Sequence, residues 1–140
     1  MTELVSRQAT MSDINTVLSD LSEQTIAEFR AVRLSPRRFV ADAANDGQRI
    51  WVCAGEQPLA LFAFEDQGPY CTMWFIASAT YFGSPAFVRS SARGFRRLGH
   101  QKPVVCTTFS PHPDVERWYR IMGFEMILHE GQMRQFIFQP

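Results

Sequence analysis

A tyrosine near the end of the chain carries the clearest chemical signal in the sequence. Tyr119 stands four residues before Gly123, and Phe124 follows the glycine directly. Glycine adopts a positive φ without steric cost, so Gly123 can end a short helix and reverse the chain. Phe124 then returns to the core as a strand begins. This arrangement predicts that Tyr119 offers its phenol to whatever lies above the sheet.

The segments on either side of Tyr119 have the patterns needed to position it. A helical pattern runs from 114 to 122, and a strand-like run follows at 125–129. Upstream, residues 103–109 have the composition of a buried strand and lead into the loop 110–113. We therefore expect a strand, a short helix and a second strand, with Tyr119 near the carboxyl end of the helix.

The remaining hydrophobic periodicities predict alternating strands and helices. In chain order we expect a strand at 4–8, helices at about 12–29 and 35–45, strands at 49–54, 59–64 and 70–76, a helix at 84–98, a strand at 103–109, a helix at 114–122, and strands at 125–129 and 133–138. Short turns between the three central strands favour antiparallel pairing, whereas the helix before residue 103 favours a parallel crossover. The predicted fold class is α/β, with a mixed, mostly antiparallel central sheet flanked by helices.

Composition sets limits on the kind of protein this is. A chain of 140 residues that is 46% hydrophobic predicts one domain, spanning residues 1–140, with a single packed core. Its 14 basic and 14 acidic residues cancel, which argues against nucleic acid as a partner. No apolar run is long enough to span a membrane. The N-terminus lacks a signal-peptide pattern, so we expect a cytoplasmic protein.

The three cysteines do not have the spacing of a metal site. Cys53, Cys71 and Cys106 are far apart in sequence, and each lies in a strand-like run. We expect reduced thiols in the core and no bound metal. A nucleophilic role for Cys106 is the alternative, with His112 as its only nearby partner.

The Tyr-x-x-x-Gly-Phe pattern at Tyr119, together with the order of elements from about Leu4 to Phe138, resembles the GCN5-related N-acetyltransferase superfamily. The resemblance implies an acyl-CoA N-acyltransferase-like fold and acetyl-CoA as cofactor. It implies that Tyr119 is the general acid that reprotonates the thiolate of coenzyme A. The acceptor would be the amine of a small molecule or of a protein. Read from its own sequence context, Tyr119 could instead be a packing residue beside Trp118.

The resemblance also indicates where acetyl-CoA would bind. It would lie in a V between the strands at 70–76 and 103–109. The pantetheine arm would run along the end of the first of these strands, at Phe75, Ile76, Ala77 and Ser78. A backbone N–H near Ala77 would polarise the thioester carbonyl.

The loop expected to hold the pyrophosphate departs from the family pattern Arg/Gln-x-x-Gly-x-Gly/Ala. Gly83 matches, but Thr80 and Pro85 stand where a basic or amide residue and a small residue are usual. Proline has no N–H to donate to a phosphate. Gly83, Ser84 and Arg89 are the candidate cofactor-binding residues here. The alternative is a structural helix start, with Ser84 as the N-cap and Gly83 easing the turn.

The remaining candidates are a general base for the reaction and a stripe of positively charged side chains. Glu65, at the end of a strand, and His112 are candidate bases for the acceptor amine. Arg89, Arg93, Arg96 and His100 form a stripe at helical spacing. The stripe could meet the 3′-phosphate of coenzyme A, an acidic protein partner or nucleic acid, or it could be a solvated helix face.

Two classes of function follow from these residues. The first is an N-acetyltransferase-like enzyme that uses acetyl-CoA and an unknown amine. The second is a catalytically inactive acetyltransferase-fold protein that acts by binding, such as a phage internal virion or head-assembly protein. In the second case the protein would be virion-associated. A nucleic-acid-binding module is a third, weaker alternative.

Overall fold

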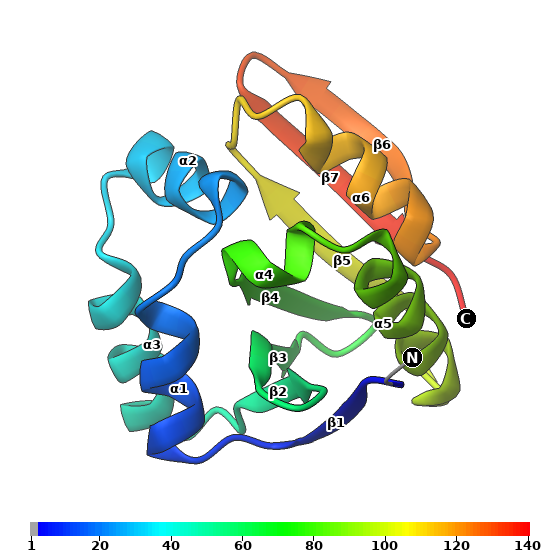
Figure 1. The fold of residues 1–140 in the computed structure, drawn as a ribbon. Coiled ribbons are helices and arrows are strands. Elements are labelled where there is room, and N and C mark those ends of the chain that lie inside the picture. The colour runs from blue at the N-terminus through cyan, green and yellow to red at the C-terminus, as the bar shows by residue number, and fades with distance from the viewer. Residues whose placement is uncertain (1–2) are drawn as a thin grey trace.

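The computed structural model describes residues 3–140 and is built around one seven-stranded sheet (Figure 1). The strands are β1 (Val5–Gln8), β2 (Trp51–Ala54), β3 (Pro58–Asp66), β4 (Cys71–Ala77), β5 (Val104–Thr108), β6 (Glu125–Glu130) and β7 (Met133–Phe138), in the spatial order β1-β2-β3-β4-β5-β7-β6. Among these strands the β4–β5 pair is parallel and the other neighbouring pairs are antiparallel. The predicted fold class is confirmed.

Helices cover the sheet on both faces and enclose two apolar clusters. On one face lie α1 (Met11–Leu18), α2 (Glu23–Val32) and α3 (Pro36–Asn45); on the other lie α4 (Ala79–Phe82), α5 (Pro85–Arg97) and α6 (Asp114–Met122) (Figure 1). Alternate side chains of β4 join opposite clusters, with Ile76 packed against the first set of helices and Ala77 against the second. The two faces of β4 are therefore both buried, as expected for a central strand.

The single helix expected at about 12–29 is wrong: the chain forms α1 and α2 with a break between them. The break exists because Leu21 pairs with Ser78 as an isolated bridge and the Ser22 N–H donates to the Ala77 carbonyl, 3.0 Å away. Ser22 then caps α2 through its hydroxyl, which accepts from the Thr25 N–H. These contacts draw the start of α2 to the end of β4.

Local sequence signals set the ends of other elements as expected. Ser35 and Ser84 are N-caps with proline in the first turn of α3 and α5. Gly123 ends α6 at φ 99°, and the N–H groups of Gly123 and Phe124 close onto the carbonyls of the last turn. The short helix α4 was not predicted.

Within residues 3–140, no helix is both long enough and apolar enough to cross a membrane.

Candidate functional site

The central feature of the molecule is a wedge between the two parallel strands. β4 and β5 are paired only at their beginnings, Cys71 with Val104 and Thr72 with Val105, and they separate beyond that point. A cavity of about 270 Å³ opens where they part. Its wall includes Trp74, on the α1–α3 side of the sheet, and Phe75, on the α4–α6 side. The cavity therefore passes through the sheet and connects its two faces.

Tyr119 lies in the wall of this cavity. Its ring stacks on Phe136 with 4.2 Å between ring centroids, so α6 holds it firmly against β7. Its hydroxyl lies on the side of the Cys106 thiol of β5. Burial first, and then the electrostatic influence of Cys106 and Glu28, raises the pKa of Tyr119 well above its usual value near 10. The phenol therefore keeps its proton at neutral pH and is available as a donor.

The helix α2 lies across the open end of the wedge and bonds to both strands. The Thr25 hydroxyl accepts from the Ala77 N–H at 3.1 Å, at the end of β4. The Glu28 carboxylate accepts from the Thr108 hydroxyl and, at 3.1 Å, from the Phe109 N–H, at the end of β5. These contacts hold the two strand ends apart at a fixed distance.

Glu28 is the site residue that the sequence analysis missed. It lines the cavity together with Gln24, Thr25, Phe29 and Val32 of the same helix face. The sequence did contain one signal for this face. Thr25 falls in the inward stripe of an otherwise apolar helical pattern, and a buried hydroxyl there requires a hydrogen-bond partner.

One edge of β4 faces the wedge with its backbone groups. Successive residues of a strand direct their N–H and C=O groups to opposite sides. The Ser78 N–H donates to Leu59 of β3, so the Phe75 groups point away from β3 and into the wedge. Ala77 points the same way, but its N–H and C=O are engaged by Thr25 and Ser22. The amide expected to polarise a thioester near Ala77 is therefore already hydrogen-bonded, and the Phe75 amide is the one directed into the wedge.

Aromatic side chains fill the space beside the wedge on the α4–α6 side. The Trp118 ring lies 4.6 Å from that of Phe75, and its indole N–H donates to the Tyr81 hydroxyl at 2.8 Å. The Tyr81 hydroxyl also bonds to Ser91 at 2.7 Å. This network ties α6 to α4 and α5 and fixes Trp118 and Phe75 in the cavity wall.

The whole chain matches solved structures of acetyltransferases. It superposes on spermidine N-acetyltransferase from Vibrio cholerae, solved in complex with CoA and spermine, with a TM-score of 0.66 at 13% identity over 96% of this chain and 94% of that one. Ribosomal-protein-alanine N-acetyltransferase from Brucella melitensis gives 0.60 at 12% identity over 95% and 98%. The chain has the GCN5-related N-acetyltransferase fold. A domain from Methanocaldococcus jannaschii gives a TM-score of 0.70 at 10% identity over 98% of both chains.

Identities this low show the fold alone, and the fold expectation drawn from the Tyr119 motif and the element order is confirmed. No protein-family model and no curated protein matches the sequence.

The loop where this fold would hold a pyrophosphate offers few free amides. Pro85 has no N–H, the Phe87 N–H donates to Ser84, and the Ala79 N–H donates to the Asp20 carbonyl at 2.8 Å. The Tyr81 N–H donates to the Ser78 hydroxyl, which caps α4. Gly83 has φ −70°, so the turn does not depend on a positive φ there. The unpaired edge of β4 is therefore available in this chain, whereas the amides of Ala79, Tyr81 and Phe87 donate to the chain's own acceptors.

Neither base candidate lies at the cavity of this acetyltransferase fold. Glu65 pairs with Thr72, the residue at which β4 and β5 are still joined, so it lies at the closed end of the wedge rather than its mouth. The His112 ring accepts from the Asp114 N–H at 3.2 Å and so caps the start of α6. Its other nitrogen lies 3.9 Å from Glu23. Neither residue lines the cavity.

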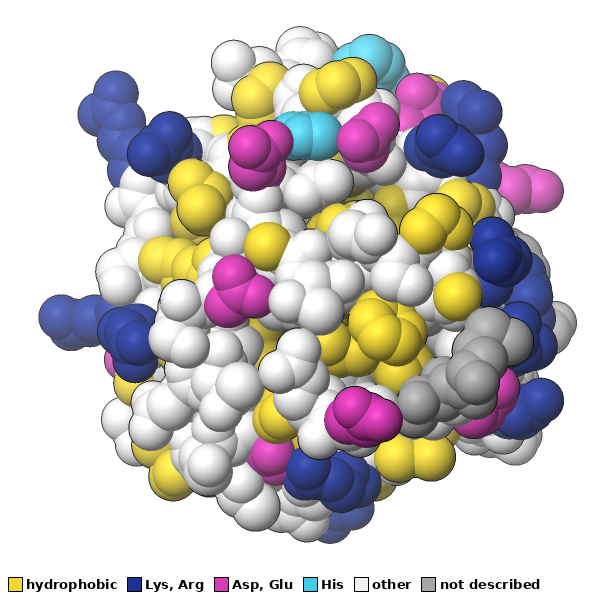
Figure 2. Space-filling model, in the orientation of Figure 1, with side chains coloured by type: hydrophobic (Ala, Val, Ile, Leu, Met, Phe, Trp, Pro, Cys, Tyr) yellow, Lys and Arg dark blue, Asp and Glu magenta, His cyan; other side chains and the backbone are white. Residues whose placement is uncertain are grey.

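The basic stripe of α5 is divided between internal contacts and solvent. Arg93 pairs with Glu3 at 3.3 Å, Arg96 donates to the Ile121 carbonyl, and His100 packs against Phe95. Arg89 is exposed on the same helix. Figure 2 shows Lys and Arg side chains gathered along one edge of the molecule, over α5 and α6. The stripe is thus partly a structural tether between the start of the chain and α5.

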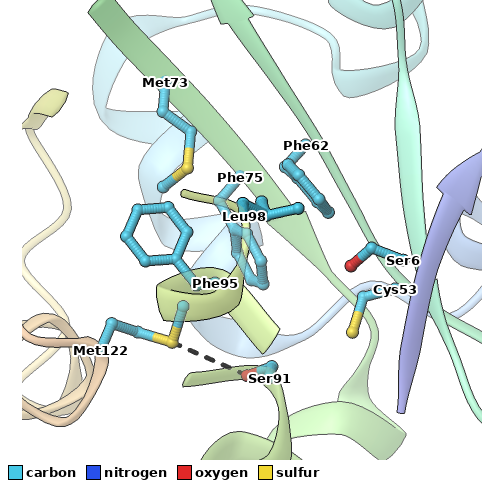
Figure 3. Close-up of a pocket in the computed structure, with 9 residues that line it drawn as sticks. All are labelled: Ser6, Cys53, Phe62, Met73, Phe75, Ser91, Phe95, Leu98 and Met122. Carbon is cyan, nitrogen blue, oxygen red and sulfur yellow. Dashed lines mark hydrogen bonds between the residues drawn. The ribbon is translucent and has the colours of Figure 1, made fainter. Parts of the chain in front are cut away.

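The thiols and the second cavity do not form a further site. Burial raises the pKa of Cys53 and of Cys106 to about 12, so neither is a thiolate at neutral pH. The described residues contain no cluster of potential metal ligands. The second cavity, beside Cys53 under α5, has a volume of about 20 Å³ (Figure 3). It has room for about one water molecule.

Proposed function

We propose that this protein transfers an acetyl group from acetyl-CoA to an amine. The observation that supports the proposal is the cavity that passes between β4 and β5 with Tyr119 in its wall. Such a passage lets a thioester approach from the α4–α6 face while an amine approaches from the α1–α3 face. The two reactants would meet beside the one phenol in the cavity wall.

The chain's own groups have distinct roles in this reaction. Acetyl-CoA supplies the acetyl group as a thioester. The Phe75 backbone, directed into the wedge, binds an extended arm as an added strand would. In the exchange the neutral amine nitrogen bonds to the carbonyl carbon, the carbon–sulfur bond breaks, and one proton passes in net terms from nitrogen to sulfur. An amine that arrives as an ammonium ion first releases its extra proton to solvent. The protonated Tyr119 hydroxyl, in the wall of the same cavity, would donate to that sulfur and stabilise its developing charge.

A second candidate function rests on the scarcity of free amides in the loop where this fold would hold a pyrophosphate. With Pro85 lacking an N–H and the amides of Ala79, Tyr81 and Phe87 engaged, the chain has few donors for a pyrophosphate. This favours the second class of function predicted from the sequence, a catalytically inactive relative that acts by binding, such as a phage particle protein. The two candidates differ in whether acetyl-CoA binds.

The test combines a binding and a chemical measurement. If the protein is an enzyme, acetyl-CoA raises its melting temperature, because a ligand of the native state stabilises it by mass action. Tyr119→Phe keeps the stack on Phe136 and removes only the hydroxyl. We expect it to lower acetyl transfer by about 100-fold or more with little change in melting temperature.

Tyr70→Phe is the matched control, since Tyr70 is exposed at the far end of the wedge. It should leave turnover unchanged. Absence of any thermal shift at millimolar acetyl-CoA would favour the binding-protein function. Full turnover in Tyr119→Phe would remove the phenol from the mechanism.

A further inference from the structure

We infer that the acceptor is a small primary amine that carries an aromatic or bulky apolar group, and that Glu28 binds its ammonium group. This inference rests on the proposed function, because it assigns the cavity at the wedge to the acceptor. It follows from three properties of the cavity wall: its charge, its aromatic surface and the fixed position of the carboxylate.

The cavity contains one formal charge. Glu28 is the only acidic side chain among the described residues that line it, and no lysine, arginine or histidine is among them. Thr25, Thr107 and Thr108 contribute neutral hydroxyls. A single carboxylate matches a single ammonium group. A polyamine would place its other ammonium groups against apolar walls at a large desolvation cost, and an anionic acceptor would be repelled.

The walls around this charge are aromatic on both sides of the sheet. On one side, Phe39 meets Phe29 edge-to-face at 5.4 Å and Trp74 at 5.3 Å, forming a continuous aromatic surface. On the other side, from which the thioester would enter, Phe75 and Trp118 close the cavity. Such surfaces favour an apolar or aromatic body and also attract the cation attached to it.

The Glu28 carboxylate is held in place and keeps capacity for a ligand. Its Oε2 accepts from the Thr108 hydroxyl and the Phe109 N–H, whereas Oε1 has only a 3.4 Å contact to the same N–H. A carboxylate has about four acceptor sites, so at least one remains for an ammonium group. Glu28 and Tyr119 line the same cavity. An ammonium group bound at Glu28 therefore shares that cavity with the proton donor.

The size of the cavity limits the acceptor. At about 270 Å³ it lies just below the range of roughly 300–1,000 Å³ typical of sites for small organic ligands. Part of this volume must also receive the acetyl group. A compact arylalkylamine is therefore a suitable probe, and a long chain or a folded protein segment is a poor one.

The first experiment measures binding without acetyl-CoA. Trp74 and Trp118 line the cavity, so tryptophan fluorescence reports its occupation. We expect 2-phenylethylamine to bind more tightly than spermidine. Glu28→Gln keeps an amide oxygen that can accept from Thr108 and Phe109 and removes only the charge. It should weaken the binding of 2-phenylethylamine by about 10-fold or more and leave the binding of neutral 2-phenylethanol unchanged, since only the amine loses a charged partner.

The control variant is Glu56→Gln, which makes the same change in an exposed turn between β2 and β3. It should bind all three probes like the parent protein. Circular dichroism and thermal unfolding check that both variants fold. Tighter binding of spermidine, or equal binding of 2-phenylethylamine by Glu28→Gln, would overturn the inference.

The second experiment separates this inference from the proposed function. With acetyl-CoA present, acetylation of spermidine but not of 2-phenylethylamine would refute the acceptor class and leave the acetyltransferase function intact. Glu28-dependent binding of 2-phenylethylamine without any binding of acetyl-CoA would have the opposite meaning. The amine site would then stand and the transferase function would fail.

Discussion

Individual side chains in the site differ in how far the sequence could locate them. The helix that carries Tyr119 was predicted correctly because the distance from Tyr119 to Gly123 is local, and a glycine cap at φ 99° fixes the end of that helix. Glu28 was missed because its position depends on a distant contact. The bridge between Leu21 and Ser78 breaks the helix and turns Glu28 toward β5. No local pattern encodes a pairing over that separation.

A buried carboxylate at the start of α1 gives a pH-dependent prediction. The Arg7 guanidinium, together with the Thr10 backbone and side chain, holds the pKa of Asp13 well below its usual range. Because the pKa is depressed in the folded state, this contribution is complete above the unfolded pKa of about 4 and is lost as pH falls below it, by up to about 1.4 kcal/mol per pH unit. Asp13→Asn should lower the free energy of unfolding by about 2 kcal/mol at pH 7.

Urea unfolding at pH 7, 5, 4 and 3 measures the free energies of unfolding that check this prediction. The difference between the parent protein and Asp13→Asn should be constant from pH 7 to 5 and shrink below about pH 4. Asp42→Asn is the control, since Asp42 and Arg38 form an exposed pair at 3.8 Å that contributes little. A difference that persists unchanged at pH 3 would show that the Asp13 ion pair does not stabilise the fold.

At the scale of elements, the helix starts after β4 set how many free amides the proposed phosphate site has. The sequence correctly identified Ser84 and Pro85 as a capped helix start. It did not reveal α4, whose amides are taken by Ser78 and Asp20. Four residues are too few for a periodic pattern, and the Asp20 contact comes from a distant part of the chain.

Because few amides at the starts of α4 and α5 are free, we expect the nucleotide half of acetyl-CoA to add little affinity. We expect acetyl-CoA and acetyl-pantetheine to bind the parent protein with similar affinity by calorimetry. Pro85→Ala restores one N–H at the start of α5 and should tighten acetyl-CoA by up to about tenfold, without changing acetyl-pantetheine.

Pro69→Ala, in an exposed turn, is the control for replacing a proline, and it should leave both affinities unchanged. If acetyl-CoA already binds the parent protein a hundredfold more tightly than acetyl-pantetheine, the account of this loop is wrong.

At the scale of the molecule, the sequence predicted the sheet and most of its elements. Short turns between β2, β3 and β4 specified antiparallel pairing, and the helix α5 required a parallel crossover to β5. The extent of the wedge could not be predicted in the same way. It depends on where β4 and β5 cease to pair and on α2, which binds the ends of both strands.

The most direct test of the wedge is a titration with S-acetylpantetheine followed by amide NMR and hydrogen exchange. Our account predicts that the Phe75 amide shifts and becomes protected, because it is directed into the wedge, while the Ser78 amide, bonded to Leu59, changes little. Residues at the closed end, such as Thr72, should not respond. Saturable binding that leaves Phe75 unchanged, or no binding at millimolar concentration, would contradict the claim that a thioester enters between these two strands.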